Sequence, residues 1–163
     1  MYYYLSIGSN IDPESNISKT LEVLLNKFSE LYLFPPVYTV PENIKSNNKF
    51  INTLAVLKSD LNITSLKNIL NDIEESLGRD RGDENRSMKD RVCDIDIIFS
   101  YEKFRIDVFN MCKEKYLNQV IDMTGVPAKI QVFGSQLSNR PSAIYLDRRS
   151  GNKLIVKDKL NSF

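Results

Sequence analysis

Two aspartates, Asp94 and Asp96, stand inside an otherwise largely apolar segment, RVCDIDIIFS at residues 91–100. The segment predicts a strand, and because strand side chains alternate between two faces, both carboxylates share a face about 6.5 to 7 Å apart. Carboxylates this close repel each other unless a positive charge lies between them. Oxygen ligands suit Mg²⁺, which binds one or two carboxylates and takes its other ligands from water and phosphate. The alternative is a half-exposed strand whose polar face meets solvent or an arginine.

Five cationic residues precede this strand within 13 positions: Arg79, Arg81, Arg86, Lys89 and Arg91. Around a pair of carboxylates, such cations are typical of a nucleoside triphosphate site, in which a metal ion bridges phosphate oxygens to the aspartates. Alternatively, they neutralise the carboxylates or belong to a solvated loop. The segment IGSNIDPE lacks the Gly-Lys-Ser/Thr ending of a phosphate-binding loop, so side chains would have to build any nucleotide site.

Composition limits the chemistry and the partners of the chain. Its 163 residues are 42% hydrophobic and 26% charged, which predicts one globular domain over residues 1–163. A net charge of +1 favours neither nucleic acid nor a membrane surface as partner. The chain has no histidine, so acid, base or metal chemistry must rest on carboxylates, lysine, tyrosine or arginine. Two cysteines, Cys93 and Cys112, lack metal-site spacing and, without an export signal, indicate a cytoplasmic protein.

The elements that must position these residues follow from the apolar pattern. Strands are expected at residues 2–7, 30–34, 50–59 and 92–99, and helices at residues 11–28 and 62–78. In the last strand, the face opposite the aspartates supplies core through Cys93, Ile95, Ile97 and Phe99. The order β-α-β-β-α-β predicts an α+β fold with a ferredoxin-like core at residues 1–101.

The remaining residues, 102–163, are expected to extend the same domain. Residues 104–123 predict partial helix, residues 128–134 a strand, and residues 143–158 a terminal hairpin with Gly151 in its turn. Residues 37–49 are polar and contain proline, so a loop is expected there.

Three segments in order, YYLSIGSN, YTVPENIKSNNKFINTLAV and IEESLGRDRGDENRSMKDRVCDIDIIF, resemble the 6-hydroxymethyl-7,8-dihydropterin pyrophosphokinases of folate biosynthesis. The resemblance covers roughly residues 2–100, and its most specific part is E-x-x-x-G-R-x-R followed by R-x-x-D-I-D-I. It implies a ferredoxin-like enzyme that transfers the β,γ-pyrophosphate of ATP to the hydroxymethyl group of the pterin, leaving AMP. It also implies two Mg²⁺ ions.

The resemblance assigns roles to individual residues. Asp94 and Asp96 are expected to bind Mg²⁺. ATP is expected to contact residues at the end of the second helix, in the following loop and in the last strand: Glu74, Arg79, Arg81, Arg86, Arg91 and Ile97. Catalysis, through stabilisation of the phosphate chain, is expected from Arg81, Lys89 and Arg91. The pterin pocket is expected to contain Gly8, Thr39, Val40, Pro41, Phe50 and Asn52.

Several of these residues also have a structural interpretation. Asn52 hydrogen-bonds the pterin ring or satisfies a neighbouring backbone group. Phe50 stacks on the ring or belongs to the core. Gly8 lies at the pocket or allows a turn with positive φ. Glu74 and Arg79 act at the ATP site or form a local ion pair.

The chain departs from the family pattern in two places. Met88 and Lys89 stand where an aromatic residue is usual, and no Pro-His-Pro-like segment follows the last strand. A second hypothesis is therefore a divergent paralogue that binds a nucleotide or another heterocycle without this catalysis. RNA binding on the sheet is disfavoured, because paired aromatic residues and a basic excess are both missing. We expect a monomer.

Overall fold

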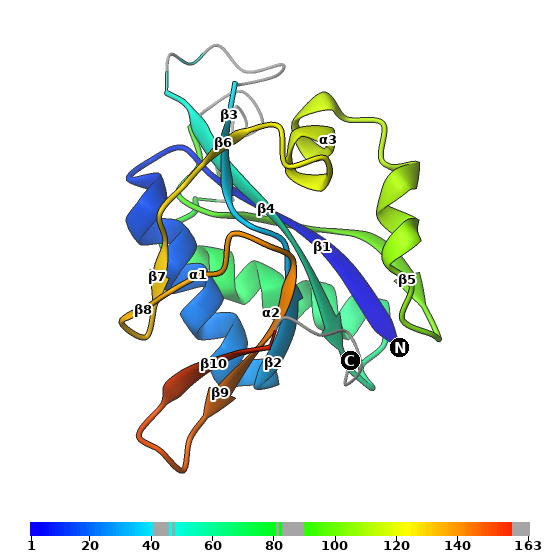
Figure 1. Cartoon of the computed structure of the whole chain (residues 1–163). Coiled ribbons are helices and arrows are strands. Elements are labelled where there is room, and N and C mark those ends of the chain that lie inside the picture. The colour runs from blue at the N-terminus through cyan, green and yellow to red at the C-terminus, as the bar shows by residue number, and fades with distance from the viewer. Residues whose placement is uncertain (41–45, 47, 81, 83–89, 158–163) are drawn as a thin grey trace.

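The computed structural model describes residues 1–40, 46, 48–80, 82 and 90–157 (Figure 1). The first part of the chain forms, in order, β1 (Tyr2–Ser9), α1 (Pro13–Phe28), β2 (Glu30–Leu33), β3 (Val37–Thr39), β4 (Phe50–Lys58), α2 (Ile63–Ser76) and β5 (Asp94–Tyr101). Antiparallel strands and helices together confirm the α+β class.

The second part of the chain adds shorter elements to this layer. They are the 3₁₀ helix η2 (Ile106–Met111), α3 (Lys115–Ile121), β6 (Val126–Pro127), β7 (Gln131–Val132), β8 (Ser135–Gln136), β9 (Ser142–Asp147) and β10 (Lys153–Lys157). The partial helix and the terminal hairpin are therefore confirmed. No helix in the described ranges has the length and hydropathy that crossing a membrane requires.

The main sheet has the strand order β10–β9–β2–β4–β1–β5, with every neighbouring pair antiparallel. β1 therefore lies between β4 and β5, and its end carries Gly8 and Ser9. The hairpin β9–β10 extends the sheet on the far side of β2, where Leu31 pairs with Ile144. β3 continues beside β4 beyond the end of β2 and is itself paired with β6.

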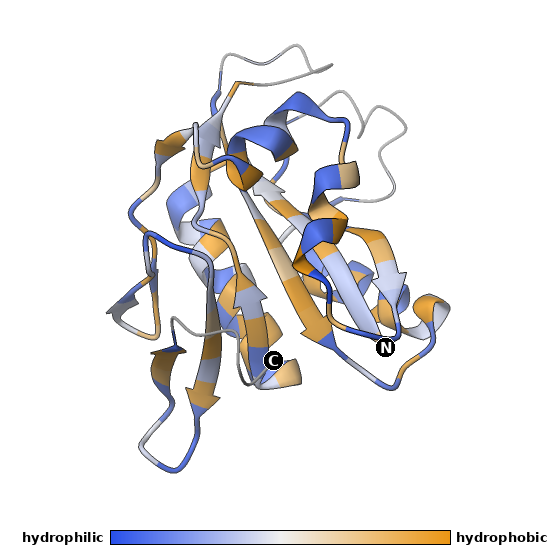
Figure 2. Ribbon diagram, turned by 45° about the vertical axis from the view of Figure 1, so that its right-hand side comes forward, coloured by the Kyte–Doolittle hydropathy of each residue, from blue (hydrophilic) through white to orange (hydrophobic). Residues whose placement is uncertain are grey.

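A buried apolar cluster lies on each face of the sheet, and Figure 2 shows the apolar residues concentrated on the strands and helices. The first cluster joins β1 and β4 to α1 and α2, whose apolar residues recur at helical spacing: Ile17, Leu21, Leu24, Leu25, Leu66, Leu70 and Ile73. The second cluster covers the opposite face with η2 and α3, through Tyr4, Tyr32, Phe34, Leu54, Val56, Phe109, Leu117 and Val120. Residues 102–121 therefore pack on the sheet rather than extending away from it.

Two expected elements differ in the structure. The expected loop at residues 37–49 begins with a strand, β3. Pro35 and Pro36 interrupt the pairing with β4, and the chain pairs with β4 again from Val37, which lies opposite Asn52. The expected strand at residues 128–134 is only β7, which forms a two-residue ladder with β8.

A β-bulge changes the faces of β5. Leu5 pairs with Ile97, whereas Tyr4 pairs with Phe99, so Ile98 is an extra residue on β5. Ile95 and Ile97 pack with the cluster on the α1 and α2 face, but Phe99 packs with the cluster on the opposite face. The prediction that Phe99 shares a face with Cys93, Ile95 and Ile97 is therefore wrong.

Candidate active site

Three predicted site residues lie in one row across the sheet. Gly8 on β1 is opposite Asn52 on β4 and opposite Asp94 on β5. Residues directly opposite each other in a sheet share a face. Two strand spacings therefore separate Asn52 from Asp94, roughly 10 Å. The row brings the expected pterin residue and the expected metal ligand to the same end of the same face.

Asp94 is the centre of an ion cluster. One carboxylate oxygen accepts a hydrogen bond from Arg79 Nη1 and the other from Arg91 Nη1, and each contact is also a salt bridge. Arg79 Nη1 donates in addition to the backbone oxygen of Cys93 at 3.0 Å. Two arginines expected to bind phosphate thus converge on one predicted metal ligand.

The end of α2 directs Arg79 toward the sheet. Gly78 has a φ of 103°, a conformation that glycine adopts without strain, and the next amide, that of Arg79, donates to the Glu74 carbonyl at 3.0 Å. Burial alone would lower the pKa of Arg79, but the hydrogen bond to Asp94 and the charges of Asp94, Glu74 and Asp96 raise it above its ordinary value. The guanidinium is therefore a permanent cation at this position.

Glu74 connects α2 to the beginning of β5. Its side chain is almost fully buried, and Oε1 accepts a hydrogen bond from the backbone N–H of Ile95 at 2.6 Å. The same oxygen lies 3.3 Å from Arg79 Nη1. Because Ile95 stands between the two aspartates, this contact fixes the strand from which both carboxylates project. The local ion pair with Arg79 is thus present, together with a strand contact that the sequence did not suggest.

Asp96 lies opposite Ser6 on the same face as Asp94 and is solvent-exposed. Neighbouring protein atoms nevertheless displace part of its hydration, and this desolvation, followed by the negative charge of Asp94, raises its pKa. Among the described residues, no three acidic, cysteine or histidine side chains are grouped to hold a metal ion. Two carboxylates on one face of a strand fit a Mg²⁺ ion that takes its remaining ligands from water and phosphate.

Three of the expected pterin residues, Thr39, Phe50 and Asn52, are buried next to one another. The amide Nδ2 donates to Thr39 Oγ1 at 2.6 Å, which connects β4 to β3, and both residues are buried. Phe50 lies opposite Thr39 and is 9% exposed, so it belongs to the sheet packing. Val40 follows β3 and is 68% exposed.

Gly8 is required by close packing rather than by a turn. It lies within β1 and does not have a positive φ. A Cβ atom at this position would lie 2.6 Å from Asn52 Oδ1, well inside contact distance. The interpretation of Gly8 as a turn glycine is therefore wrong, and the glycine makes room for the Asn52 amide.

The other predicted residues divide into two sets. The Ile97 side chain packs with the α1 and α2 cluster, on the face away from both aspartates, so only its main chain is available to a nucleotide on their side. Pro41, Arg81, Arg86 and Lys89 lie outside the described residues.

The sequence did not point to Tyr116 on α3. Desolvation raises its pKa to about 12, with smaller contributions from the negative charges of Glu114, Asp96 and Asp94. The side chain is half-buried against the cluster on the aspartate face. Its only signal in the sequence was its helical spacing with Val120, which predicts packing and not an electrostatic interaction with the two aspartates.

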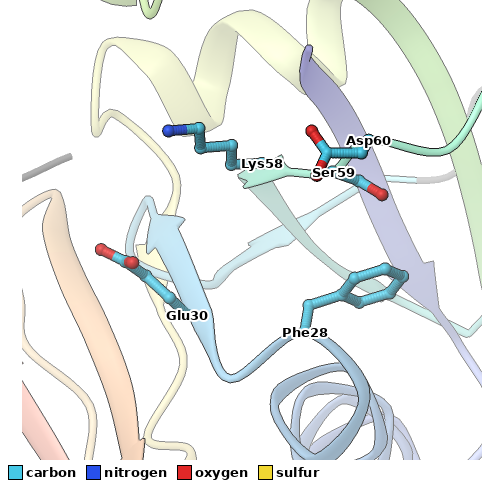
Figure 3. Close-up of a pocket in the computed structure, with 5 residues that line it drawn as sticks. All are labelled: Phe28, Glu30, Lys58, Ser59 and Asp60. Atoms are coloured by element: carbon cyan, nitrogen blue, oxygen red, sulfur yellow. The ribbon is translucent and has the colours of Figure 1, made fainter.

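A hollow lies at the opposite end of β4, lined by Phe28, Glu30, Lys58, Ser59 and Asp60 (Figure 3). Its volume of about 250 Å³ is below the roughly 300–1,000 Å³ of small-molecule pockets. It contains none of the predicted site residues, and we assign it no part in the site.

Comparison with known proteins shows the family of the chain. The model of the family 7,8-dihydro-6-hydroxymethylpterin-pyrophosphokinase (HPPK) matches residues 4–121, from within β1 to the end of α3. The chain is 35% identical over 97 residues to a 2-amino-4-hydroxy-6-hydroxymethyldihydropteridine pyrophosphokinase in each of two strains of Porphyromonas gingivalis. Each alignment covers 58% of this chain and 66% of the relative, slightly less than two thirds of its length. The chain belongs to the 7,8-dihydro-6-hydroxymethylpterin-pyrophosphokinase family.

Proposed function

We propose that this chain transfers pyrophosphate from ATP to 6-hydroxymethyl-7,8-dihydropterin and releases AMP, a step of folate biosynthesis. The observation that carries the proposal is the row Asn52–Gly8–Asp94, which presents a buried amide and a carboxylate with two arginines on one sheet face. The separation of the two ends suits a heterocycle at one end and a phosphate chain at the other.

In the proposed reaction, the hydroxymethyl oxygen of the pterin forms a bond to the β-phosphorus of ATP. The bond between that phosphorus and the α,β-bridging oxygen breaks, the oxygen leaves with AMP, and the hydroxyl proton passes to water. The chain contributes mainly positioning and charge stabilisation, as is usual in phosphoryl transfer.

Each end of the row has a separate task in this scheme. Asn52, held by Thr39, offers donor and acceptor atoms to the edge of the pterin, and Phe50 contributes an apolar contact to the ring. Arg79 and Arg91 bind phosphate oxygens, and Arg91 stabilises the charge that develops on them. Arg81, Arg86 and Lys89 are proposed to provide further positive charge that stabilises the phosphate oxygens. Pro41 is proposed to lie beside the pterin.

Asp94 and Asp96 are the residues that would hold Mg²⁺, and two such ions would neutralise the phosphate chain of ATP. Desolvation, and after it the charge of Asp94, raises the pKa of Asp96, and a bound cation would stabilise the ionised carboxylate against both effects, which supports this role.

Other features of the chain support the proposed fold and the proposed compartment. The order β2–β4–β1–β5, with helices after β1 and β4, supports a ferredoxin-like core within one domain of residues 1–163. Cys93 and Cys112 are both free thiols, which supports action in the cytoplasm. We propose that the enzyme acts as a monomer on small molecules, without nucleic acid.

Incubation of the protein with ATP, Mg²⁺ and the hydroxymethyl dihydropterin tests the proposal. AMP release that depends on the pterin and is lost in an Asp94→Ala/Asp96→Ala variant is the expected result. Binding of Mg-ATP without any AMP above that variant would instead support the divergent paralogue.

A further inference from the structure

Tyr38, the central residue of β3, connects that strand to the first turn of α1. Its hydroxyl donates a hydrogen bond to Glu14 Oε1. This hydrogen bond is the largest of the effects that raise the pKa of Tyr38 to about 12. The phenol therefore stays protonated, and able to donate, well above neutral pH.

The contact with Glu14 lies on one face of β3, and the site lies on the other. Tyr38 and Thr39 are consecutive in the strand, so their side chains point to opposite faces. Tyr38 packs with the cluster on the α1 and α2 face, whereas Thr39 Oγ1 accepts from Asn52 Nδ2 at 2.6 Å. A rotation of β3 about its own axis would move both side chains, so the contact that holds Tyr38 also holds Thr39.

The two polar atoms of the Asn52 amide face different strands. Gly8 on β1 and Val37 on β3 are both opposite Asn52. Nδ2 donates to Thr39 on β3, whereas Oδ1 is directed toward Gly8, where a Cβ atom would lie 2.6 Å from it. The orientation of the amide therefore depends on how β1 and β3 are placed relative to each other.

The start of α1 is connected to both of these strands. It is held to the end of β1 through the Ile11 carbonyl, which accepts from Asn16 Nδ2 at 2.5 Å and from Ser9 Oγ at 3.2 Å. Glu14, in the first turn of the same helix, accepts from Tyr38 of β3. The hydrogen bond between Glu14 and Tyr38 thus links the two strands that flank the amide.

We propose that Tyr38, through Glu14, is a positioning residue that fixes the orientation of the Asn52 amide for pterin recognition. The inference rests on the proposed function and adds to it a residue on the face away from the pterin. With one N–H of Nδ2 on Thr39, the amide presents its other N–H and Oδ1 to the heterocycle in a single arrangement. An amide without this support would lose more rotational freedom on binding and would bind the ring more weakly.

Tyr38→Phe removes the hydroxyl and keeps the packing of the ring. We expect the KM for 6-hydroxymethyl-7,8-dihydropterin to rise about fivefold or more, with kcat and the KM for ATP within about twofold of the wild type. Glu14→Ala should have the same effect, and Glu14→Gln, which keeps an acceptor oxygen, should have much less. Tyr101→Phe is the matched control, because this ring packs edge-on against Tyr4 at the end of β5 far from Asp94.

The double variant shows whether the two residues act through their contact. In a Glu14→Ala background, Tyr38→Phe should raise the pterin KM little further. Additive effects overturn the route through Glu14. An unchanged pterin KM in Tyr38→Phe, or an equal rise in the KM for both substrates, overturns the positioning role.

NMR of the ligand-free protein tests the same role without substrates. The Nδ2 protons of Asn52 are expected to exchange with solvent about fivefold faster in Tyr38→Phe than in the wild type or in Tyr101→Phe. Unchanged exchange overturns the positioning of the amide by Tyr38. A wild type that does not turn over the pterin overturns the proposed function, and the exchange experiment then still decides whether Tyr38 positions Asn52.

Discussion

Asn52 on β4 and Asp94 on β5 lie opposite the same residue, Gly8, on the strand between them. One end of this row carries a buried amide that donates to Thr39, and the other end carries a carboxylate paired with Arg79 and Arg91. The row explains why β1 has a glycine near its end, since a larger residue there would clash with Asn52. It also predicts that the two ends can be disturbed separately.

Gly8→Ala is expected to damage pterin binding selectively. The added Cβ would lie 2.6 Å from Asn52 Oδ1, so the amide must rotate or move and lose its contact with Thr39. We expect a roughly ten- to hundredfold loss in kcat/KM for the pterin. The KM for ATP should change by less than about threefold. Steady-state kinetics with each substrate varied in turn gives both values.

A double-mutant cycle shows whether Gly8 acts through Asn52. If it does, Gly8→Ala causes little further loss of activity in an Asn52→Ala background, because the group that it displaces is already absent. Additive losses in the cycle would contradict the packing role assigned to Gly8.

Glu74→Ala is expected to lower the free energy of unfolding by about 2–4 kcal/mol, because it leaves the buried Ile95 N–H without its acceptor and removes one anion beside Arg79. Glu74→Gln keeps an acceptor and should cost less. Urea unfolding with an unchanged m-value measures both. Asp72→Ala, at an exposed position of the same helix, should stay within about 0.5 kcal/mol of the wild type. A loss no larger than that of Asp72→Ala would show that Glu74 does not hold β5.

The ionised form of Asp96 is expected to oppose folding when no cation is bound. Its pKa is raised above the ordinary 3.8 by desolvation and by Asp94, so the folded state holds the proton more tightly than the unfolded chain. The free energy of unfolding therefore falls as the pH rises through the interval between the ordinary and the raised pKa. We expect Asp96→Asn to be more stable than the wild type at neutral pH in metal-free buffer. The difference should shrink as the pH falls toward about 4.

Adding Mg²⁺ reverses this comparison. The ion should raise the melting temperature of the wild type and have a smaller effect on Asp96→Asn, which lacks one of its two carboxylates. Asp72→Asn serves as the control for loss of an exposed charge. Equal stability of Asp96→Asn and the wild type at neutral pH would contradict the unfavourable ionisation assigned to Asp96.

Both thiols should be unreactive in the folded protein. Burial raises the pKa of Cys93 to about 12 and that of Cys112 to about 11, so neither forms much thiolate at mildly alkaline pH. Ellman's reagent should therefore label neither cysteine quickly before unfolding and both after unfolding in urea. Rapid labelling of one thiol in the native protein would show that its burial is transient.

Local patterns predicted the parts of the fold that depend on neighbours in the sequence. The helical stripes of α1 and α2 and the alternation of Asp94, Ile95 and Asp96 depend only on periodicity, and the structure contains all of them. The bulge at Ile98 was not predictable, because three consecutive apolar residues at 97–99 fit either face. β3 was missed because it becomes a strand only through pairing with β4.

Contacts between distant residues explain what the sequence could not supply at the site. The hydrogen bond from Asn10 to Asp90 joins residues 80 positions apart, and no spacing rule connects them. Tyr116 reaches the aspartate face because η2 and α3 pack there, and helical spacing alone does not fix that docking. The sequence was sufficient to identify the residue types of the site, whereas the contacts that support them depend on the tertiary fold.

The products of one incubation test the central claim most directly. Phosphorus NMR of the protein with ATP, Mg²⁺ and 6-hydroxymethyl-7,8-dihydropterin should show AMP and a diphosphate ester of the pterin forming in equal amounts. Neither product should form with the Asp94→Ala/Asp96→Ala variant. Formation of ADP, or AMP release that does not depend on the pterin, would contradict pyrophosphate transfer from ATP, bound near Asp94, to the pterin, bound near Asn52.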